Sequence, residues 1–409
     1  LARADPNRWR EVALLAGAKA ARGTEPSAWL LAETLSHEPA PPPEAADPLP
    51  APAAWGALLA GQVLVESARL DELAPRNAAK RERIRDWQLA LLRRRGLPAV
   101  ERALAGRHLA ALGDPRPEVM TLDGMQFVAV PPGPFWMGAD DMSDAQPCHR
   151  VDLDYAFAVG RFPVSAAQWR EYRRHSGSDG DETFRQGRDN EPIVRVAWHD
   201  ALRFCVWLTE AWRGHLPAGW VVTLPSEAEW EKAARGGEQV PARPEPFTLP
   251  EAASRLRAAA DGPVLANPWP RRAYPWGDDF DAERANVQQA IGEPSALGAF
   301  PAGASPVGAE EMAGNVWEWT RSLYGKDIFK PTFGYPYQAD DARREDLSAK
   351  DDVYRVVRGG SWSGLRVDAR CAYRDWYSPV FRYGYLGFRV VLRSSPVEMP
   401  LWRRVLRAL

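Results

Sequence analysis

Few side chains of this sequence have the chemistry of a nucleophile or of a soft-metal ligand. The cysteines are Cys148, Cys205 and Cys371. They are odd in number and widely separated, which is neither a disulfide framework nor the paired spacing of a zinc site. The cysteine pattern therefore predicts a protein of the reducing cytoplasm.

The histidines are also scattered. No two of them lie four residues apart, the spacing that places two imidazoles on one face of a helix to bind a metal. We therefore interpret them as surface or capping residues. They are His37, His108, His149, His175, His199 and His215.

The densest group of aromatic residues lies in RGGSWSGLRVDARCAYRDWYSPVFRYGYLGFRVV, which runs from Arg358 to Val391. A strand of the core would alternate apolar and polar residues, but here Arg, Asp, Ser, Pro and Gly interrupt the rings irregularly. A catalytic pocket would combine a nucleophile, a general base and an orienting acid, and Asp375 alone does not decide for one.

A recognition surface explains the composition of this stretch best. Tyr, Trp, Ser, Gly and Asp are the residues of antibody paratopes, where rigid rings supply contact area at a low entropic cost. We predict that the stretch binds a protein or a small-molecule ligand. The predicted ligand-binding residues are Trp362, Ser363, Leu365, Tyr373, Asp375, Trp376, Tyr377, Ser378, Phe381, Tyr383 and Tyr385.

Burial should divide the aromatic residues into two groups. The rings among Gly, Ser and Pro should be exposed and clustered on one face, because irregular backbone cannot bury them and also satisfy its polar groups. These are Trp376, Tyr377, Phe381, Tyr383 and Tyr385. The rings at periodic positions should be buried, and these are Trp230, Trp317, Trp319 and Phe388.

The bulk composition limits the classes of partner. The formal net charge of the 409 residues is -2, with 52 basic and 54 acidic side chains, so no global field attracts nucleic acid or an anionic membrane surface. No window reaches the roughly 18 consecutive apolar residues of a membrane span. We therefore expect a soluble chain with neither nucleic acid nor membrane as its partner.

The elements that precede the aromatic stretch fall into two regions. Residues 1–115 show helical periodicity in four blocks, interrupted by the Pro-rich segment HEPAPPPEAADPLPAPAA. The breakers of LGDPRPEV then end this small all-α region. Because the chain begins with Leu1 inside a helical pattern, we expect it to be the C-terminal part of a longer protein.

Residues 116–395 predict an α+β domain with much ordered loop. Short alternating runs such as MQFVAV predict strands. Capping boxes predict helices after Ser165, with Gln168, and after Ser226, with Glu229. WHDALRFCVWLTEAW predicts a third amphipathic helix, and loops should dominate from Gly237 to Gly359. Residues 396–409 form a tail.

Six phrases of this second region resemble the formylglycine-generating enzyme (sulfatase-modifying factor) family. They occur in the family's order: FWMG, TLPSEAEWEKAARGG, YPWGD, MAGNVWEWT, RVVRGGSW and GFRVV. The resemblance covers roughly residues 120 to 395. It implies a C-type-lectin-like fold, in which a compact α+β structure supports a broad surface of loops.

The family's founding activity is the oxidation of a substrate cysteine, with copper held by two thiolates after GGS. Gly364 stands where the first thiolate belongs, and Cys371 matches a different position. The resemblance therefore implies a non-catalytic protein without copper-dependent cysteine oxidation, with an oxidase of the same fold as the alternative. The related iron-dependent sulfoxide synthases of ergothioneine formation need a histidine cluster that this sequence lacks.

The resemblance also implies a structural calcium ion in the GNVWEW segment. The matching ligands are Glu311, the carbonyls of Gly314 and Val316, and Glu318. Carboxylate and carbonyl oxygens are the ligands that Ca²⁺ prefers. A second calcium site would use Asn286 and the Val287 carbonyl, but Gly298 replaces its acidic ligand.

Within the family, the aromatic stretch is similar to the variable cassette of bacterial diversity-generating retroelement proteins, in which template adenines are miscopied. Mutated AAY codons can become Tyr, Asp, Ser, Phe, Val, Gly or Leu, but not Trp. The sequence thus predicts a hypervariable, aromatic-rich surface for ligand recognition. The N-terminal helices resemble a tail that follows bacterial signalling NTPases, and the NTPase would lie outside this chain because no Gly-rich loop with Lys is present.

Overall fold

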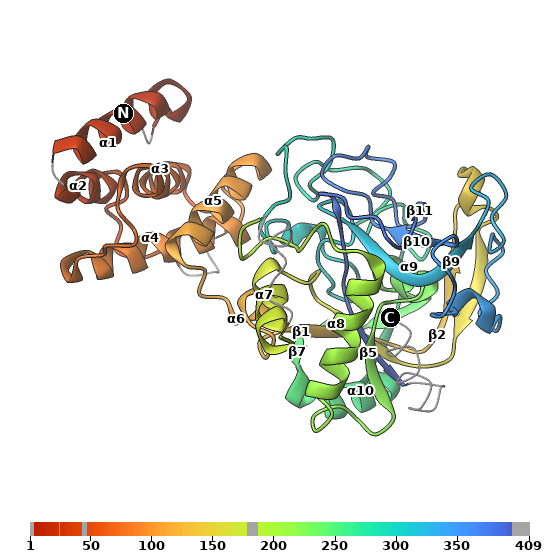
Figure 1. The fold of residues 1–409 in the computed structure, drawn as a ribbon. Helices are drawn as coiled ribbons and strands as arrows, with labels where there is room; N and C mark the ends of the chain where they lie inside the picture. The colour runs from red at the N-terminus through yellow and green to blue at the C-terminus, as the bar shows by residue number, and fades with distance from the viewer. Residues whose placement is uncertain (1–3, 24, 43–46, 178–186, 395–409) are drawn as a thin grey trace. The chain divides into compact units, whose positions relative to one another are not determined.

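The computed structural model describes residues 4–23, 25–42, 47–177 and 187–394 (Figure 1). The predicted tail, residues 396–409, lies outside the described residues. The chain divides into two compact units, which consist of Leu1–Arg116 with Gly298–Pro301 and of Pro117–Leu297 with Ala302–Leu409. Helices precede a mixed helix and sheet unit, and this confirms the predicted α+β class with its all-α N-terminal region.

The first unit contains five helices in its described part. The central helix, α3, has a nearly continuous apolar sequence and is buried along most of its length, as a helix that is apolar all round must be. The helices are α1 (Pro6–Gly23), α2 (Glu25–Leu35), α3 (Ala51–Ser67), α4 (Ala78–Arg93) and α5 (Ala99–Leu112).

Helix α2 was not predicted from the sequence. Its 11 residues are too few for a helix that is stable alone in water, so its own pattern is a weak signal. Tertiary packing stabilises it, because Trp29, Ala32 and Leu35 are buried in one cluster with residues of α3. The predicted helical blocks 53–70, 78–96 and 99–112 correspond to α3, α4 and α5.

A five-stranded sheet forms the centre of the second unit, in the order β5-β13-β4-β1-β7. Every neighbouring pair in this sheet is antiparallel. Alternation along the strands turns Phe127 and Val222 to one face and Val128 to the other. The strands are β1 (Gln126–Val130), β4 (Phe157–Gly160), β5 (Trp220–Thr223), β7 (Phe247–Thr248) and β13 (Val391–Ser394).

Both faces of this sheet are covered. Helices α7 (Ala166–His175), α8 (Trp198–Ala211) and α10 (Ala252–Asp261) contribute side chains to the core on one face (Figure 1). Helix α9 (Glu227–Arg235) contributes to the core on the opposite face. Helices α7 and α9 begin at the predicted capping boxes, so both helix starts are confirmed.

A second, four-stranded sheet has the order β11-β10-β9-β12. Its strands are β9 (Trp317–Gly325), β10 (Tyr354–Arg358), β11 (Arg374–Tyr377) and β12 (Leu386–Gly387). All nine residues of β9 are buried. Loops make up most of residues 237–359, as expected, although this interval also contains β9, β10 and α10. Two further strand pairs are β2 (Gly133–Met137) with β3 (His149–Leu153), and β6 (Gln239–Pro241) with β8 (Val264–Ala266).

Helix α9 is unusual because it is buried along its whole length although it carries three glutamates. Each carboxylate is paired with arginine side chains of the surrounding strands. Arg374 donates to both oxygens of Glu227, at 2.7 and 2.9 Å, and Arg358 bonds Glu231. Arg321 and Arg393 donate to the two oxygens of Glu229, at 2.6 and 3.1 Å. Burial of α9 therefore requires these ion pairs, because an unpaired buried charge is very costly.

A separate buried ion pair joins the two sheets. Arg389 donates to both carboxylate oxygens of Glu318 on β9, each at 2.7 Å, and the indole nitrogen of Trp230 donates to the same carboxylate at 2.6 Å. The Arg389 guanidinium also donates to the carbonyls of Gly160 and Glu310, at 2.8 and 2.9 Å. The Arg389 side chain thus connects β9, β4 and the loop that contains Glu310. The hydrogen bond from Trp230 connects α9 to the same Glu318 carboxylate.

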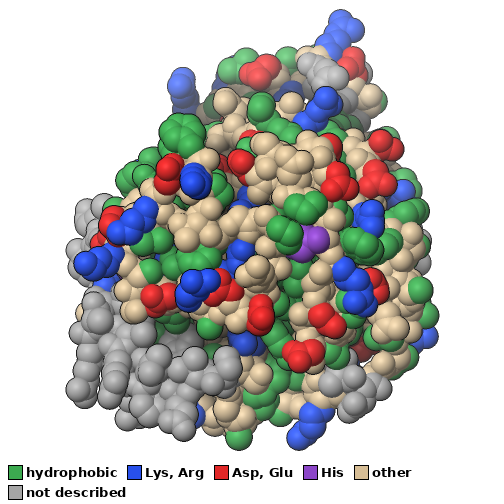
Figure 2. Space-filling view, turned by 90° about the vertical axis from the view of Figure 1, so that its right-hand side faces the viewer, with side chains coloured by type: hydrophobic (Ala, Val, Ile, Leu, Met, Phe, Trp, Pro, Cys, Tyr) green, Lys and Arg blue, Asp and Glu red, His purple; other side chains and the backbone are tan. Residues whose placement is uncertain are grey.

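The surface and the helices carry two further findings. On the face drawn in Figure 2, acidic and basic side chains are interspersed among hydrophobic ones, and the coloured residues show no broad area of one charge sign. Within the described ranges, no helix combines the length and the apolar character that crossing a bilayer requires.

Substitution of Arg389 tests the ion pair with Glu318. We expect Arg389→Met to lower the free energy of unfolding by about 3–5 kcal/mol, because it leaves a buried carboxylate without its cation. Urea unfolding followed by tryptophan fluorescence measures the change. Arg343→Met is the matched control, since the Arg343 side chain is exposed and its pair with Asp341 is screened by water, so its loss should change stability little. Equal losses in the two variants would contradict the assignment.

The pairing of Glu229 predicts how stability depends on acid. Burial raises the pKa of Glu229, but Arg321, Arg393 and the hydrogen bonds to the carboxylate outweigh it and lower the pKa to about 2. Because the pKa is lowered in the folded state, the Glu229 carboxylate adds stability when the pH is above the ordinary glutamate pKa of 4.5. This stability is lost as the pH falls toward 2. The contribution is on the order of 3 kcal/mol.

Comparison with Glu229→Gln isolates this contribution. The stability difference between the native protein and the variant should be largest above pH 4.5 and should shrink toward pH 2, where the native carboxyl becomes protonated. Thermal unfolding across this pH range measures it. A difference that stays constant with pH would show that the charge of Glu229 does not matter.

Candidate ligand-binding face

Strand β11 decides which side chains of the aromatic stretch point in the same direction. It pairs antiparallel with β10, with Trp376 opposite Val356 and Asp375 opposite Val357. Because side chains alternate along a strand, Arg374 and Trp376 lie on one side, and Asp375 and Tyr377 lie on the other. Arg374 extends into the interior to Glu227.

Three aromatic rings form a continuous cluster with Tyr377. The centroid of the Tyr377 ring lies 5.4 Å from that of Tyr383 and 6.3 Å from that of Tyr385. The rings of Tyr383 and Tyr385 stack at 5.1 Å, and Phe381 contacts Tyr383 edge-on at 5.4 Å. Offset and edge-to-face contacts of this kind stabilise ring pairs beyond their buried area.

This cluster rests on buried tryptophans of β9. Tyr377 packs edge-on against Trp319 at 6.4 Å, and Tyr373 packs against Trp317 at 5.9 Å. We call Tyr373, Asp375, Tyr377, Phe381, Tyr383 and Tyr385 the aromatic face. Its members come from a single interval of the chain and stand on a rigid floor.

The predicted division by burial is confirmed for one group and corrected for the other. Trp230, Trp317, Trp319 and Phe388 are all buried. Of the rings expected to be exposed, only Phe381 is, at 40%. Tyr377, Tyr383 and Tyr385 are half-buried because one side of each ring packs on the core.

Trp376 does not belong to the aromatic face. It packs against Tyr354 at 4.9 Å and Tyr324 at 5.8 Å, on the opposite side of β11 from Tyr377. The expectation that Trp376 clusters with the tyrosines is therefore wrong, because the alternation of the strand separates them.

The remaining predicted ligand-binding residues flank the face. The Trp362 indole donates to the carbonyl of Gly384 at 3.3 Å, which connects the loop after β10 to the tyrosine segment. Ser363 is half-buried with its hydroxyl 3.1 Å from that of Ser361, and Leu365 is exposed. Ser378 is half-buried and donates weakly to the Asp351 carbonyl at 3.5 Å.

The aromatic face combines phenol side chains with one carboxyl group, and burial shifts the pKa of three of its members. Burial, followed by the charges of Asp368 and Asp375, raises the pKa of Tyr373 to about 12. Burial and the Asp375 charge also raise the pKa of Tyr377. Burial raises the pKa of Asp375, and the charges of Asp368 and Asp144 add to this effect. Tyr373 and Tyr377 are therefore neutral hydrogen-bond donors at physiological pH.

Two acidic residues near this face were not predicted. Asp368 accepts the Leu365 backbone N–H at 2.8 Å and is hydrogen-bonded by Tyr373. Asp144 lies in a short 3₁₀ helix, Ser143–Ala145, and its negative charge helps to raise the pKa of Tyr373 and of Asp375. Asp368 lies within the aromatic stretch, so composition could have indicated it. Nothing in the local sequence connects Asp144 with residues that follow more than two hundred positions later.

A copper centre with two thiolate ligands does not fit the residues at this face. Gly364 carries no side chain, and the Cys371 thiol is buried with its pKa raised to about 11, chiefly by burial. Among the described residues, no three His, Cys, Asp or Glu side chains are grouped as a metal site.

Glu318 is not placed as a calcium ligand. Both of its carboxylate oxygens accept hydrogen bonds from Arg389, and a cation would have to displace that guanidinium. Glu311 has a positive φ of 58° and accepts from the Asn315 amide at 2.7 Å. Calcium at Glu311, Gly314 and Val316 stays a prediction.

The alternative calcium site contains an oxygen that suits a cation. The side-chain oxygen Oδ1 of Asn286 is buried and accepts no hydrogen bond, whereas the Nδ2 of the same amide donates to the Glu293 carbonyl at 2.9 Å. An unpaired buried oxygen fits a hard cation, so Asn286 and the Val287 carbonyl would hold it. The sequence still lacks an acidic ligand at Gly298.

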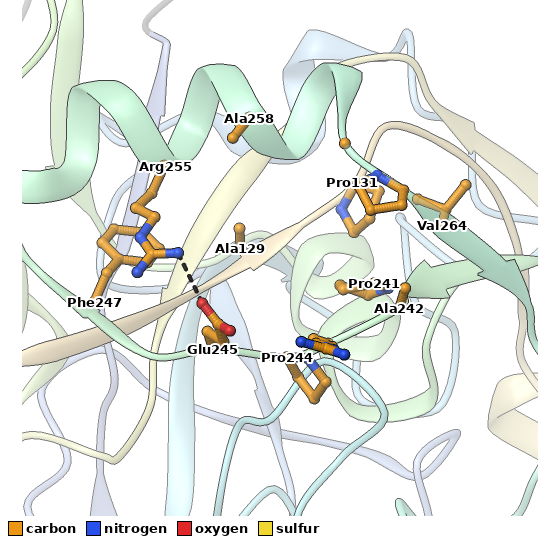
Figure 3. A pocket seen from close by; sticks show the side chains of 13 residues that line it. Ala129, Pro131, Pro241, Ala242, Pro244, Glu245, Phe247, Arg255, Ala258 and Val264 are labelled. Carbon is orange, nitrogen blue, oxygen red and sulfur yellow. Dashed lines mark hydrogen bonds and ion pairs between the residues drawn. The ribbon is translucent and has the colours of Figure 1, made fainter.

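A cavity of about 400 Å³ lies elsewhere in the second unit (Figure 3). Ala129 of β1, Phe247, and prolines of the segments around β6 and β8 line it, and the Glu245–Arg255 ion pair crosses one wall at 2.9 Å. None of the predicted ligand-binding residues takes part in it. The aromatic face therefore remains the site that the sequence indicated.

Comparisons with known proteins identify relatives of the second unit. Hercynine oxygenase of Mycolicibacterium smegmatis is 30% identical over 302 residues, which are 64% of this chain and 60% of that protein. Formylglycine-generating enzyme of Streptomyces coelicolor is 30% identical over 243 residues, which are 55% of this chain and 58% of that protein. The chain thus spans less than two thirds of the length of both relatives.

A solved structure with a similar fold is Treponema denticola variable protein 1. It is 21% identical, with a TM-score of 0.44, and the match covers 66% of this chain and 95% of that one.

The prediction that the chain is not an enzyme is contradicted by these relatives. Hercynine oxygenases and formylglycine-generating enzymes are enzymes, and both are similar to this chain over more than half of its length.

A family model described as the sulfatase-modifying factor enzyme 1-like domain matches residues 113–394. This match covers more than half of the 409 residues and includes every strand of both sheets. The chain therefore belongs to the family of sulfatase-modifying factor enzyme 1-like domains.

Proposed function

We propose that this chain recognises a ligand through its aromatic face, as the variable protein of a diversity-generating retroelement. The observation that carries the proposal is the location of the face. Residues 373–385 place five aromatic rings and one carboxyl group together, above a floor formed by Trp317 and Trp319. The ligand is a protein or a small molecule.

The physical properties of the face suit recognition. The tyrosines are held by ring contacts before a ligand arrives, so binding orders few rotamers and loses little entropy. Their half-buried rings still offer apolar area, and the neutral hydroxyl groups of Tyr373 and Tyr377 can donate hydrogen bonds. These are the features of antibody paratopes.

The positions between the face residues are fixed by packing. Arg374 is paired bidentately with Glu227 in the interior. The Pro379 carbonyl accepts the N–H of Trp198 at 3.0 Å. A Cβ at Gly387 would lie 2.4 Å from the Ile193 carbonyl oxygen, so no larger residue fits there. Variation restricted to the face would leave these anchors intact.

Codon chemistry agrees with this division. Tyr, Asp and Phe, the residue types of the face, are all reachable from AAY codons by changes at adenines. Trp376 is not reachable in this way, and its side chain lies off the face, against Tyr324 and Tyr354. Trp376, which changes at the adenines of an AAY codon cannot produce, is thus also a residue that lies off the aromatic face.

The encoding DNA tests the proposal. We expect a near-copy of the region for residues 359–389 close to the gene, differing from it at adenines in the codons for Tyr373, Tyr377 and the other face residues. A reverse transcriptase gene should lie beside it. Sequencing the locus measures both.

The anchor codons are the internal control of this comparison. The codons for Arg374, Pro379 and Gly387 should be identical in the gene and the copy, because substitution there disrupts packing. A locus with neither the copy nor the reverse transcriptase gene would refute the retroelement assignment.

An oxidative activity is the second candidate function. The observation in its favour is the 30% identity with a hercynine oxygenase over 302 residues. The aromatic face would bind the substrate, and Asp375, whose pKa is raised by burial, would hold or release a proton there. The described residues do not supply the histidine or cysteine ligands that such a centre needs, so no step is assigned to a metal.

Oxygen consumption tests this second candidate. If the face is catalytic, the purified chain with ferrous iron, hercynine and a thiol such as cysteine, which supplies the sulfur and electrons, should take up oxygen faster than the same mixture without protein. Asp375→Asn should reduce this uptake by about tenfold or more if the carboxyl transfers a proton. Asp279→Asn, at an exposed position outside the face, is the matched control. No uptake above the protein-free rate would eliminate this candidate.

A further inference from the structure

A second cavity, of about 610 Å³, shares no residue with the aromatic face. It lies against the ends of β5 and β13, beside the residues that follow β3 and the segment 337–347. Val221 and Thr223 of β5 line it together with Arg393 of β13. Arg393 is the register partner of Val221, so these three side chains share one face of the sheet.

The charges deep in this cavity compensate one another. Arg321 is paired with Glu229 at 2.6 Å and with Glu345 at 2.8 Å. Arg393 is paired with Glu229 at 3.1 Å, and its guanidinium lies 4.8 Å from the centroid of the Tyr155 ring. The interior therefore has two cations and two anions, and it attracts neither sign strongly.

The remaining charged residues of the lining are all acidic. Asp152, Asp154 and Asp340 are exposed, and none of them forms an ion pair with another described residue. Three exposed carboxylates attract a cation and repel an anion, although the charge of Asp152 also acts on Arg150 and Lys232. The lining also contains the apolar groups of Leu153, Tyr155, Val221 and Leu347.

Thr223 supplies a second, independent indication of a ligand. It is only 2% exposed, and its hydroxyl oxygen Oγ1 has no hydrogen-bond partner. Buried hydroxyl groups in native proteins are almost always paired, because leaving one unpaired costs stability. Thr223 belongs to the cavity lining, so a ligand in the cavity could satisfy this hydroxyl by a rotation of the side chain.

We propose that this cavity binds a small organic amine with an apolar body and a neutral polar end. The ammonium group lies at the mouth, near Asp152, Asp154 and Asp340. The apolar body lies along Leu153, Tyr155 and Leu347, and the neutral end forms a hydrogen bond with Thr223.

The charge distribution fixes this orientation. An ammonium group at Thr223 would lie among charges that compensate one another, so it would gain little there, whereas the carboxylates of Asp152, Asp154 and Asp340 attract it at the mouth. A neutral hydroxyl or amide needs no charged partner at Thr223. The volume lies within the usual range of about 300–1,000 Å³ for small-molecule sites. The site is independent of the proposed role of the aromatic face.

Three small probes test whether the ligand needs an ammonium group and a neutral polar end. Two of them differ from the first, tyramine, in one group. Tyramine has an ammonium group, an aromatic body and a hydroxyl group. Phenethylamine lacks the hydroxyl, and 4-hydroxyphenylacetate has a carboxylate in place of the amine. Isothermal titration should show binding of tyramine, roughly three- to tenfold weaker binding of phenethylamine, and little binding of the anion. Binding should also weaken as salt is added.

Variants of the lining locate the site. Thr223→Val keeps the shape of the side chain, so it should leave thermal stability unchanged or raise it while reducing tyramine affinity to the level of phenethylamine. The double variant Asp154→Asn/Asp340→Asn should reduce the affinity for tyramine by about three- to tenfold or more. Asp279→Asn, at an exposed acidic position outside the cavity, should change nothing.

Several outcomes would overturn the proposal. It fails if tyramine does not bind at millimolar concentration, or if 4-hydroxyphenylacetate binds equally well. It also fails if Thr223→Val and the double variant bind tyramine with native affinity. Because the aromatic face is unchanged in every variant, these results bear on the cavity alone.

Discussion

The second unit depends on the burial of helix α9, which is possible only because arginines neutralise its three glutamates. Arg321, Arg358, Arg374 and Arg393 come from β9, β10, β11 and β13, so strands of both sheets converge on one helix. The cost of burying a charge without a partner is severe, so each of these pairs constrains where its strand lies. The Glu318–Arg389 pair adds a further link through the Trp230 indole. The arrangement of both sheets therefore follows from electrostatic pairing as well as from apolar packing.

Local sequence signals predicted the elements whose boundaries are set by nearby residues. The capping boxes at Ser165 and Ser226 predicted the starts of α7 and α9, because each box is formed within one turn of chain. Strand β9 could not be predicted in this way. Its polar residues Glu318 and Arg321 suggest a half-exposed segment, but their partners, Arg389 and Glu229, lie 71 and 92 positions away. Burial of such a strand is visible only when those partners are in place.

The candidate site shows the same limit. Composition indicated the aromatic stretch as the candidate site, and its tyrosines do lie together. The place of Trp376 depends on the strand alternation of β11 and its pairing with β10, and neither is encoded in the stretch itself. Glu318 was predicted to be a calcium ligand, but its carboxylate pairs with Arg389. The spacing of residues in the sequence does not reveal this pairing. Asp144 and Thr223 gave no local signal, because their neighbours come from distant parts of the chain.

The alternation along β11 has a consequence for how this domain can evolve. Arg374 is directed into the interior, while the adjacent Asp375 belongs to the aromatic face, so neighbours in sequence belong to different energetic environments. Substitutions whose side chains share no partners tend to have additive effects on stability. Epistasis between binding positions and folding positions should therefore be weak, even though both types alternate within a few residues. A lineage could thus explore new specificities without having to acquire compensating changes in the core.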